Sequence, residues 1–388
     1  MIIEQKYRVF LKYIYLLLYM LIFLDKFNPV FCHELFSKLE LIMPLLGAIV
    51  IALTVERVKD YRLYLFFSFF LMLGLSQYIK NYPLVPLFIL LPLFKYERIN
   101  SFVKFYAYVL TGYLIINIVL STLGFLPFKF SGDPSAVGLN IGPFTLFADN
   151  RYIFSFVHHN CIGLLSFSAV CCWYYLCYKN HFKKYGLFLF GCIATSFFLL
   201  SIVKSRTGGY GIAIVILLSL IQYLFTVKKR YLFDCWCYLC KYAWLLPIIL
   251  FFVFFLVSIF YNSDNYILST INAIFSGRAS LTHEAINTYG IPLFGQSIAF
   301  CGYGCEQYFY VDSMYAKGVY EYGLVLQAIL LIFFCYRIIC IGKFKNFEMV
   351  VILVAAAFVC LSEEINFLTF PFLIGFFMDD FTNAKELL

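Results

Sequence analysis

Apolar stretches of 12 to 21 residues follow one another along the whole chain, separated by small clusters of charged residues. A helix needs about 20 apolar residues to cross a hydrocarbon layer roughly 30 Å thick, so the longer stretches indicate membrane spans and the shorter ones are candidates. Charged residues make up 13% of the chain, against about 25% in soluble domains. The sequence therefore predicts an all-α, polytopic integral membrane protein in which residues 1–388 form a single membrane domain.

Twelve candidate spans are placed on these stretches. The runs at 83–94 and 366–378 are short for a bilayer, so each is expected to be a shallow segment or a broken helix buried in protein. Residues 1–24 are basic and then apolar, but no small-residue cleavage site follows, so the first run is expected to remain as a span. The twelve lie at 9–24, 39–55, 63–79, 83–94, 105–125, 158–178, 187–203, 210–227, 242–260, 318–336, 347–361 and 366–378.

The basic residues indicate how these spans are oriented. With both termini cytoplasmic, 20 of the 29 lysines and arginines fall in the cytoplasmic segments, as the positive-inside rule requires. The same rule explains the net charge of +8 better than nucleic-acid binding does. The long connections 126–157 and 261–317 then lie on the outer face. Connections longer than about 12–15 residues are usually functional or disordered, and the aromatics and glycines in these two favour folded, functional outer loops.

Metal chemistry is not indicated by the cysteines. Cys235, Cys237 and Cys240 have C-x-C-x-x-C spacing without a second cysteine pair or histidine partners, so zinc is the less favoured interpretation. Most of the other cysteines lie in apolar runs, where a thiol acts as a small hydrophobic group. Cys301 and Cys305 leave open a disulfide in an outer loop.

The acidic pairs do not form a metal site either. Asp379 and Asp380 fall on the cytoplasmic side, and the outer pair Glu363 and Glu364 are adjacent, so on a helix they point about 100° apart. The chain also has no glycine-rich phosphate loop and no other nucleotide-binding motif. We therefore expect a metal-independent protein without a cofactor, and neither ATP nor a nucleotide sugar as its direct substrate.

The cations on the outer face include Arg151, Lys204, Arg206 and Arg278. An arginine near a membrane often only extends its side chain toward the headgroups. Its guanidinium also binds phosphate oxygens with two parallel hydrogen bonds. Three arginines on the face that should be depleted of them favour a site for a pyrophosphate lipid head group. Lys204 is open between a second phosphate contact and a surface charge.

Several segments near these cations resemble the O-antigen polymerase and O-antigen ligase superfamily. "KSRTGGYGIAIVILL" is similar to the family's Ser-Arg-small-Gly turn, with Ser205 and Arg206 starting a helix after a short outer turn. "FSGRASLTHEAINTYGIPLFG" resembles the family pattern of Ser-Gly-Arg, an amphipathic helix and Pro-Leu-Phe-Gly, with Arg278 as the arginine and His283 where an aromatic is common. Gly208 and Gly209 are expected to form a tight turn that lets the backbone pass close to a neighbour.

A third segment, "NRYIFSFVHHN", resembles the family form Arg, spacer, Gly-Phe-x-His-Pro-Asn. Arg151, His158 and Asn160 match, whereas Ser155 and His159 stand in place of the glycine and the proline. His158 and Asn160 are also open to a simpler interpretation, in which they only cap the following span.

Two downstream segments extend the resemblance to about residue 370. In "VDSMYAKGVYEYGL", Asp312, Tyr315 and Gly323 match the polymerase form, whereas ligases tend to have His-Asn near this aspartate. "LSEEINFLTFPF" resembles a late glutamate turn, with Glu363, before a final span. The order and common outer placement of these motifs favour the polymerase over the ligase and imply a GT-C-like architecture of about 12 helices.

The resemblance implies a membrane glycosyltransferase. Its donor would be a glycan on a polyisoprenyl (undecaprenyl) pyrophosphate carrier, and its acceptor a second lipid-linked repeat unit at the outer face of the cytoplasmic membrane. The leaving pyrophosphate needs cations, for which Arg206 and Arg278 are the first candidates and Arg151 the third.

The acceptor hydroxyl needs a base. The candidates are His158, Asp312 and Glu363, although a carboxylate beside arginines is often only a structural ion pair. His283 is the least favoured. The further expected substrate contacts are Asn160, Lys204, Ser205 and Tyr315.

Other functions compete with this one. The same scaffold would serve a ligase for O-antigen, and a flippase or transporter of lipid-linked oligosaccharide is a non-enzymatic alternative. Transporters tend to have internal repeats and charged or broken helices at the membrane midplane, and this chain has largely uncharged spans without an evident repeat. The expected partners of a polymerase are the bilayer, the lipid-linked oligosaccharide, a chain-length regulator and a flippase.

Overall fold

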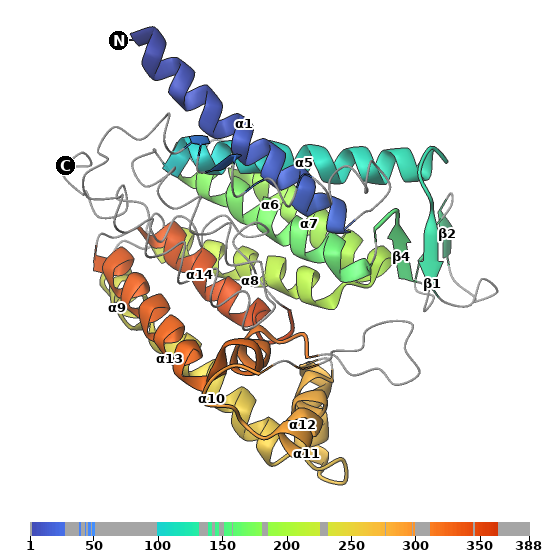
Figure 1. Cartoon of the computed structure of the whole chain (residues 1–388), viewed down its shortest axis with the longest axis vertical. Helices are drawn as coiled ribbons and strands as arrows, with labels where there is room; N and C mark the ends of the chain where they lie inside the picture. The colour runs from blue at the N-terminus through green and yellow to red at the C-terminus, as the bar shows by residue number, and fades with distance from the viewer. Residues whose placement is uncertain are drawn as a thin grey trace. The chain divides into compact units, whose positions relative to one another are not determined.

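The structure, a computed structural model of the whole chain, is mostly helical where it is described (Figure 1). The described residues are 2–27, 99–131, 139–141, 144–146, 151–156, 158–180, 185–225, 232–275, 277–296, 311–343 and 346–363, with a few single positions between 39 and 50 and at 298. The expected spans at 63–79, 83–94 and 366–378, most of the one at 39–55, and Cys301 and Cys305 lie outside them.

The chain divides into two compact units, and each is described by itself below. Unit 1 comprises residues 1–76, 82–213 and 366–388, and unit 2 comprises residues 77–81 and 214–365. Helix α8 (Arg206–Tyr223) begins in unit 1 and ends in unit 2.

Unit 1 is built around two long helices that pack along each other. The α5·α6 contact is fixed by the indole of Trp173, which donates to Thr111 at 2.9 Å, and by an edge-to-face contact of that indole with Tyr108. Phe102 and Tyr106 of α5 are fully buried. The described helices of this unit are α1 (Ile2–Phe27), α5 (Ile99–Thr122), α6 (His159–Asn180), α7 (Tyr185–Phe198) and the π-helical turn η2 (Leu199–Val203), which continues α7.

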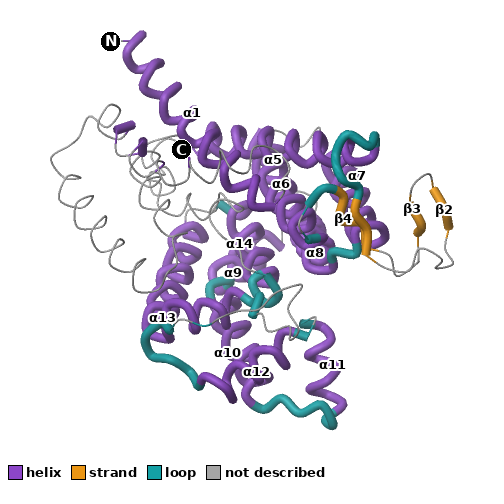
Figure 2. Tube along the Cα trace, turned by 45° about the vertical axis from the view of Figure 1, so that its right-hand side comes forward, coloured by secondary structure: helices purple, strands orange, loops and turns teal. Residues whose placement is uncertain are grey.

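The connection expected at 126–157 contains short antiparallel strands, drawn in orange in Figure 2. Its buried side chains, Tyr152 and Phe154, pack on Phe128, and Phe154 also contacts Phe198. The connection is therefore a folded loop anchored to the helices where it is described. β1 (Lys129–Ser131) pairs with β4 (Arg151–Phe154), and β2 (Leu139–Ile141) pairs with β3 (Phe144–Leu146).

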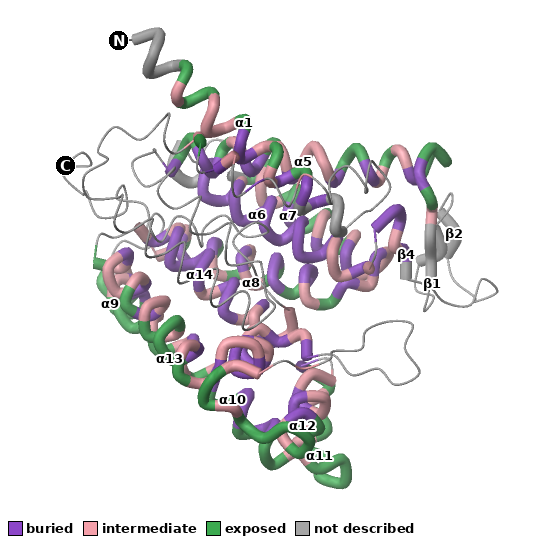
Figure 3. The backbone as a smooth tube through the Cα atoms, in the orientation of Figure 1, coloured by how far each residue is buried: buried purple, intermediate pink, exposed green. Residues whose placement is uncertain are grey.

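Unit 2 is all-helical where it is described. Its core is formed by aromatic side chains of α10, among them Phe251, Phe254 and Phe255, against α12, α13 and α14. Helix α14 is buried along most of its length, whereas α9 and α13 each have an exposed face (Figure 3). The helices are α9 (Phe233–Tyr242), α10 (Leu245–Ile259), α11 (Tyr266–Ile274), α12 (Arg278–Tyr289), α13 (Met314–Lys343) and α14 (Phe347–Val359).

Helix α13 is broken at Gly323, which has φ 87° and ψ 156°. The segment after α12 supplies the hydrogen bonds that the break removes: Leu324 N–H donates to the Pro292 carbonyl at 2.9 Å, and Gln296 N–H donates to the Tyr320 carbonyl at 3.0 Å. A Cβ at Gly323 would overlap with the backbone of Phe294. Only glycine at position 323 therefore lets the segment Pro-Leu-Phe-Gly pack against the break in α13.

The helices confirm a membrane-embedded protein, in a coarser form than the twelve expected spans. Five described helices are long and apolar enough to cross a bilayer, or six if the α9–α10 pair, bent by 50°, is one span. The expected spans at 105–125, 158–178, 187–203, 210–227 and 318–336 correspond to those five. The span expected at 242–260 corresponds to α10 of the bent pair, α14 is a shorter apolar helix, and α1 is not among the five.

Candidate functional site

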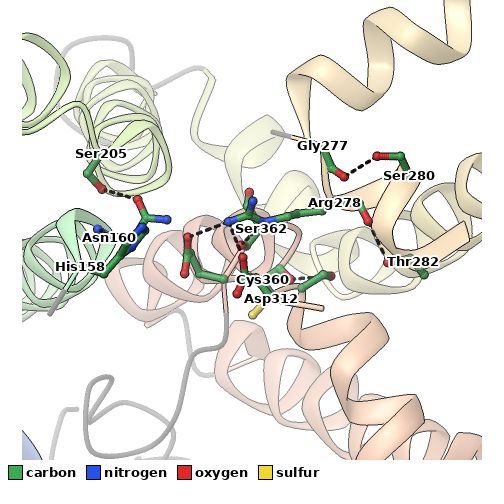
Figure 4. A network of polar contacts seen from close by, with 12 residues as sticks. His158, Asn160, Ser205, Gly277, Arg278, Ser280, Thr282, Asp312, Cys360 and Ser362 are labelled. Carbon is green, nitrogen blue, oxygen red and sulfur yellow. Dashed lines mark hydrogen bonds and ion pairs between the residues drawn. The ribbon is translucent and has the colours of Figure 1, made fainter. Parts of the chain in front are cut away.

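Three predicted site residues from distant parts of the sequence meet in unit 2 (Figure 4). Arg278 Nη2 lies 2.6 Å from Asp312 Oδ2 and 3.6 Å from Glu363 Oε1. Arg278 Nε donates to the carbonyl oxygen of Ser362 at 3.3 Å. We call Arg278, Asp312 and Glu363 the arginine–carboxylate cluster.

Arg278 is placed by a tight turn between α11 and α12. Gly277 has φ 81° and is the residue before α12, and its N–H donates to the Asn272 carbonyl at 2.8 Å. The side chain of Asn272 also accepts from Ser280 N–H at 3.0 Å and donates to Ser280 Oγ at 3.3 Å. Only glycine adopts this φ without strain, so the Ser-Gly-Arg pattern makes the arginine the first residue of its helix.

Asp312 is placed by hydrogen bonds that join the start of α13 to the end of α14. The Cys360 carbonyl accepts from Met314 N–H at 3.0 Å and from Ser313 Oγ at 3.2 Å. The hydroxyl of Tyr315 donates to the Ala357 carbonyl at 3.0 Å, and the tyrosine is buried. Tyr315, expected to contact substrate, thus has a structural contact that holds the two helices together beside the cluster.

The cluster is largely shielded from water, with exposed side-chain fractions of 15% for Arg278, 17% for Asp312 and 14% for Glu363. Arg278 therefore does not extend into headgroups as an isolated surface arginine would. Its one positive charge lies beside two carboxylates. In such an environment electrostatic interactions are stronger than in water, and removing one partner of a pair is costly.

A second group of predicted residues meets in unit 1. Ser205 Oγ donates to Asn160 Oδ1 at 3.4 Å, and Asn160 N–H donates to His158 Nδ1 at 3.3 Å (Figure 4). The rings of His158 and His159 lie 3.9 Å apart between centroids. His158 precedes α6, and the bond from the Asn160 N–H is a cap for that helix, as the simpler interpretation predicts.

Small residues let α8 approach α6 at this point. A Cβ added to Gly208 would overlap with the backbone of Gly163, and one added to Gly163 would overlap with Ser205 Oγ. Such close crossings through small residues are typical of membrane helices. A Cβ at Gly209 would meet Leu200 at 2.5 Å. The glycine pair thus provides close helix approach, and the reversal of the chain occurs just before it.

That reversal is made at Lys204, which has φ 59° and ends η2. Ser205 is fully buried, whereas the next residue, Arg206, is exposed. Arg206 thus follows a fixed turn and points out of the packed part of unit 1, as a contact for an external anion would. Arg151 is the first residue of β4, and only its backbone is described.

His283 is held by structural contacts. Its Nδ1 lies 2.8 Å from the Ser258 carbonyl, and its Nε2 lies 2.9 Å from Asn287 Nδ2. Since a carbonyl only accepts, the Nδ1–H of His283 donates to Ser258. His283 links α12 to the end of α10.

The sequence did not single out the buried pair Ser155 and Asn117. Ser155 Oγ donates to Asn117 Oδ1 at 3.3 Å, and both side chains are nearly inaccessible. Asn117 lies within an apolar run, and a buried amide needs a hydrogen-bond partner, so its position was the signal that could have predicted this pair. Ser155, the residue directly after β4, thus holds the end of this strand on α5.

No group of three or more histidine, cysteine or acidic side chains among the described residues could hold a metal ion. Cys235, Cys237 and Cys240 are free thiols. Comparison of the sequence and structure with family models, curated proteins and solved structures finds no match.

Proposed function

We propose that the protein is a membrane glycosyltransferase of the O-antigen polymerase kind, which extends a glycan on a polyisoprenyl pyrophosphate carrier. The observation that supports this most is the arginine–carboxylate cluster. It brings together, from three segments of the chain, a cation for a leaving pyrophosphate and two carboxylates for a proton transfer.

The reaction asks for two changes at one carbon. The acceptor hydroxyl forms a bond to the anomeric carbon of the donor sugar, and the bond from that carbon to the pyrophosphate oxygen breaks. The hydroxyl proton passes to a carboxylate, and negative charge develops on the pyrophosphate. A preorganised cation that stabilises this charge contributes about 3 kcal/mol to lowering the barrier.

The two carboxylates are suited to different roles. Asp312 is in short contact with Arg278, at 2.6 Å, and so holds the guanidinium in place. Glu363 is at 3.6 Å from the same nitrogen, which leaves its oxygens more capacity to accept a proton from a hydroxyl. We therefore propose Arg278 as the contact for the leaving group, Asp312 as the residue that positions it and Glu363 as the base.

In unit 1, Arg206 is proposed to keep its predicted role, whereas the residues near it take a supporting one. Arg206 is exposed after a fixed turn, which supports a role in binding phosphate. Asn160, Ser205 and His158 form one hydrogen-bonded group behind it. Because both of these hydrogen bonds join residues of the protein to one another, we propose that this group supports the turn at Arg206.

A ligase and a transporter are each compatible with part of these observations. A ligase would need the same pyrophosphate chemistry, and Asp312 in place of His-Asn favours the polymerase on the resemblance alone. A transporter would favour a broken membrane helix, and α13 is broken at Gly323. The backbone groups at that break form hydrogen bonds with residues 292–296 and so are not left for a solute. This supports a fixed bend.

Deletion of the gene followed by analysis of the surface glycan and of the lipid-linked pool tests the proposal. A polymerase defect leaves carrier lipid with a single repeat unit at the outer face. Long lipid-linked chains that never reach their final acceptor identify a ligase, and the failure of any lipid-linked unit to reach the outer face identifies a flippase. Either of these two outcomes would refute the proposal.

A further inference from the structure

A cavity of about 280 Å³ lies in unit 2, where the end of α9 meets the end of α13. Lys241, Tyr242 and Trp244 line it from the bend between α9 and α10, Lys343 from the last turn of α13 and Phe347 from the start of α14. Helices α9 and α13 approach each other closely here, at Cys240 and Gly342. None of these residues belongs to the arginine–carboxylate cluster or to the expected outer loops.

The charges in this cavity are all of one sign. Both lysines are exposed, and neither forms an ion pair within the part of the chain that the structure describes. The acidic residues of the bordering helices α9 and α14, Asp234 and Glu348, do not line the cavity. Lys241 Nζ lies 5.6 Å from the centre of the Tyr242 ring, so its charge is held at the bend.

The surroundings are those of a membrane interface. Helix α9 is bent by 50° from α10, and its Tyr238 and Leu239 are exposed by 62% and 58%. Tyrosine and tryptophan are enriched where membrane helices leave the hydrocarbon. Tyr242 and Trp244 lie at this bend. Apart from the lysines, the lining is mainly aromatic and aliphatic. A small soluble anion would leave most of such a lining uncovered.

We propose that this cavity binds an anionic glycerophospholipid, with the lipid phosphate between Lys241 and Lys343 and the glycerol end of its chains against Trp244 and Phe347. An ammonium is a compact charge that binds a phosphate without a fixed geometry. Basic pockets between membrane helices on the cytoplasmic side take such headgroups, and both lysines belong to connecting segments that the charge pattern predicts to be cytoplasmic. The site is independent of the proposed glycosyltransferase activity.

Lipid titration of the purified full-length chain in a neutral detergent tests the site. Phosphatidylglycerol and phosphatidylcholine with the same brominated acyl chains are compared by quenching of tryptophan fluorescence and by native mass spectrometry. We expect phosphatidylglycerol to bind at least tenfold more tightly. Lys241→Gln and Lys343→Gln should each lower its affinity about fivefold, since a lysine at an anionic surface contributes about that factor. Lys104→Gln, an exposed lysine of α5, is the control and should leave the affinity unchanged.

Trp244→Phe provides a second measurement that keeps both lysines. It should remove most of the lipid-dependent quenching while the bound lipid is still seen in the mass spectrum. Equal affinity for the two lipids, or wild-type affinity in the double lysine variant, would overturn the proposal. Competition by inorganic phosphate at the same concentration as the lipid would also overturn it, because the site would then recognise phosphate alone.

Discussion

The two ends of α13 carry cations in opposite settings. Beside its Met314 end, Arg278 lies among the carboxylates of Asp312 and Glu363. At its other end, Lys343 and Lys241 line a cavity without a carboxylate in its lining. The 20 residues from 324 to 343 extend about 30 Å at 1.5 Å per residue, roughly the thickness of the hydrocarbon layer.

The difference shows what each end is suited to do. A guanidinium with carboxylate partners is fixed in position, and it has five N–H donors, so it can contact a leaving group while the carboxylates stay beside it for a proton transfer. Lysines without such partners attract a mobile anion directly. The first setting favours a chemical step and the second favours binding, so substitutions at the two ends should affect different measurements.

Arg278→Ala should have the largest effect. It removes the cation proposed to stabilise the leaving pyrophosphate, so polymerisation by the purified protein should fall at least a hundredfold. Arg278→Lys should restore little of it, because the two parallel hydrogen bonds of the guanidinium are lost. Binding of phosphatidylglycerol at the other end should not change. The measurement is chain formation from a lipid-linked repeat unit, with protein content of the membrane determined in parallel.

Lys317→Ala is the matched control for that arginine. Lys317 belongs to the same end of α13 and pairs with Glu321 at 3.6 Å, one helical turn on. This pair is as shielded as the cluster, with side-chain exposures of 12% and 18%, so its loss should lower the stability. Activity should stay within about threefold of the wild type, because neither residue has a proposed part in the reaction. If Lys317→Ala and Arg278→Ala reduced activity equally, this end would respond to the loss of any ion pair, and the special role of Arg278 would be wrong.

Asp312→Asn and Glu363→Gln should separate the two carboxylates. Glu363→Gln removes the proposed base, so kcat should fall about a hundredfold with little change in Tm. Asp312→Asn removes the short contact to Arg278, so it should lower Tm as well as activity, about tenfold, because the guanidinium is no longer held. The opposite pattern, with kcat most affected by Asp312→Asn, would exchange the roles of the two residues.

The sequence predicts the described helices better than their breaks. The spans expected at 158–178 and 347–361 correspond to α6 at His159–Asn180 and α14 at Phe347–Val359, since length and apolarity determine such helices. The 50° bend between α9 and α10 lies where the span expected at 242–260 begins, directly after Lys241, but the sequence did not predict the helix α9 that precedes it. The break at Gly323 depends on residues 292–296, which are close to it only in three dimensions.

The site was predicted residue by residue and not as an arrangement. Arg278, Asp312 and Glu363 were each selected from local motifs, and their meeting depends on how the Cys360 carbonyl joins α13 to α14. Periodicity carries no information about such a contact between distant segments. Tyr315 was expected at the substrate, and its hydroxyl instead bonds to a backbone carbonyl.

Gly323→Ala should be strongly destabilising at the Met314 end. Its φ of 87° and ψ of 156° are adopted almost only by glycine and cost alanine about 1–3 kcal/mol, and the added Cβ would also overlap with the Phe294 backbone. We expect a fall in Tm of at least several degrees and a loss of polymerisation. Gly112→Ala in α5, where a Cβ would have no neighbour within 4 Å, should raise the stability by about 0.5–1 kcal/mol.

Gly342→Ala should have the smallest effect, and it probes the opposite end. An added Cβ would lie 3.2 Å from the Cys240 carbonyl oxygen, so that neighbour has to move by a few tenths of an ångström. The helix propensity of alanine, better than that of glycine by about 1 kcal/mol, offsets this cost, and Tm should change little. Because Gly342 lines the lysine cavity, phosphatidylglycerol should bind about threefold more weakly while polymerisation stays at the wild-type rate. A loss of polymerisation as large as that of Gly323→Ala would show that the two ends of α13 act as one site.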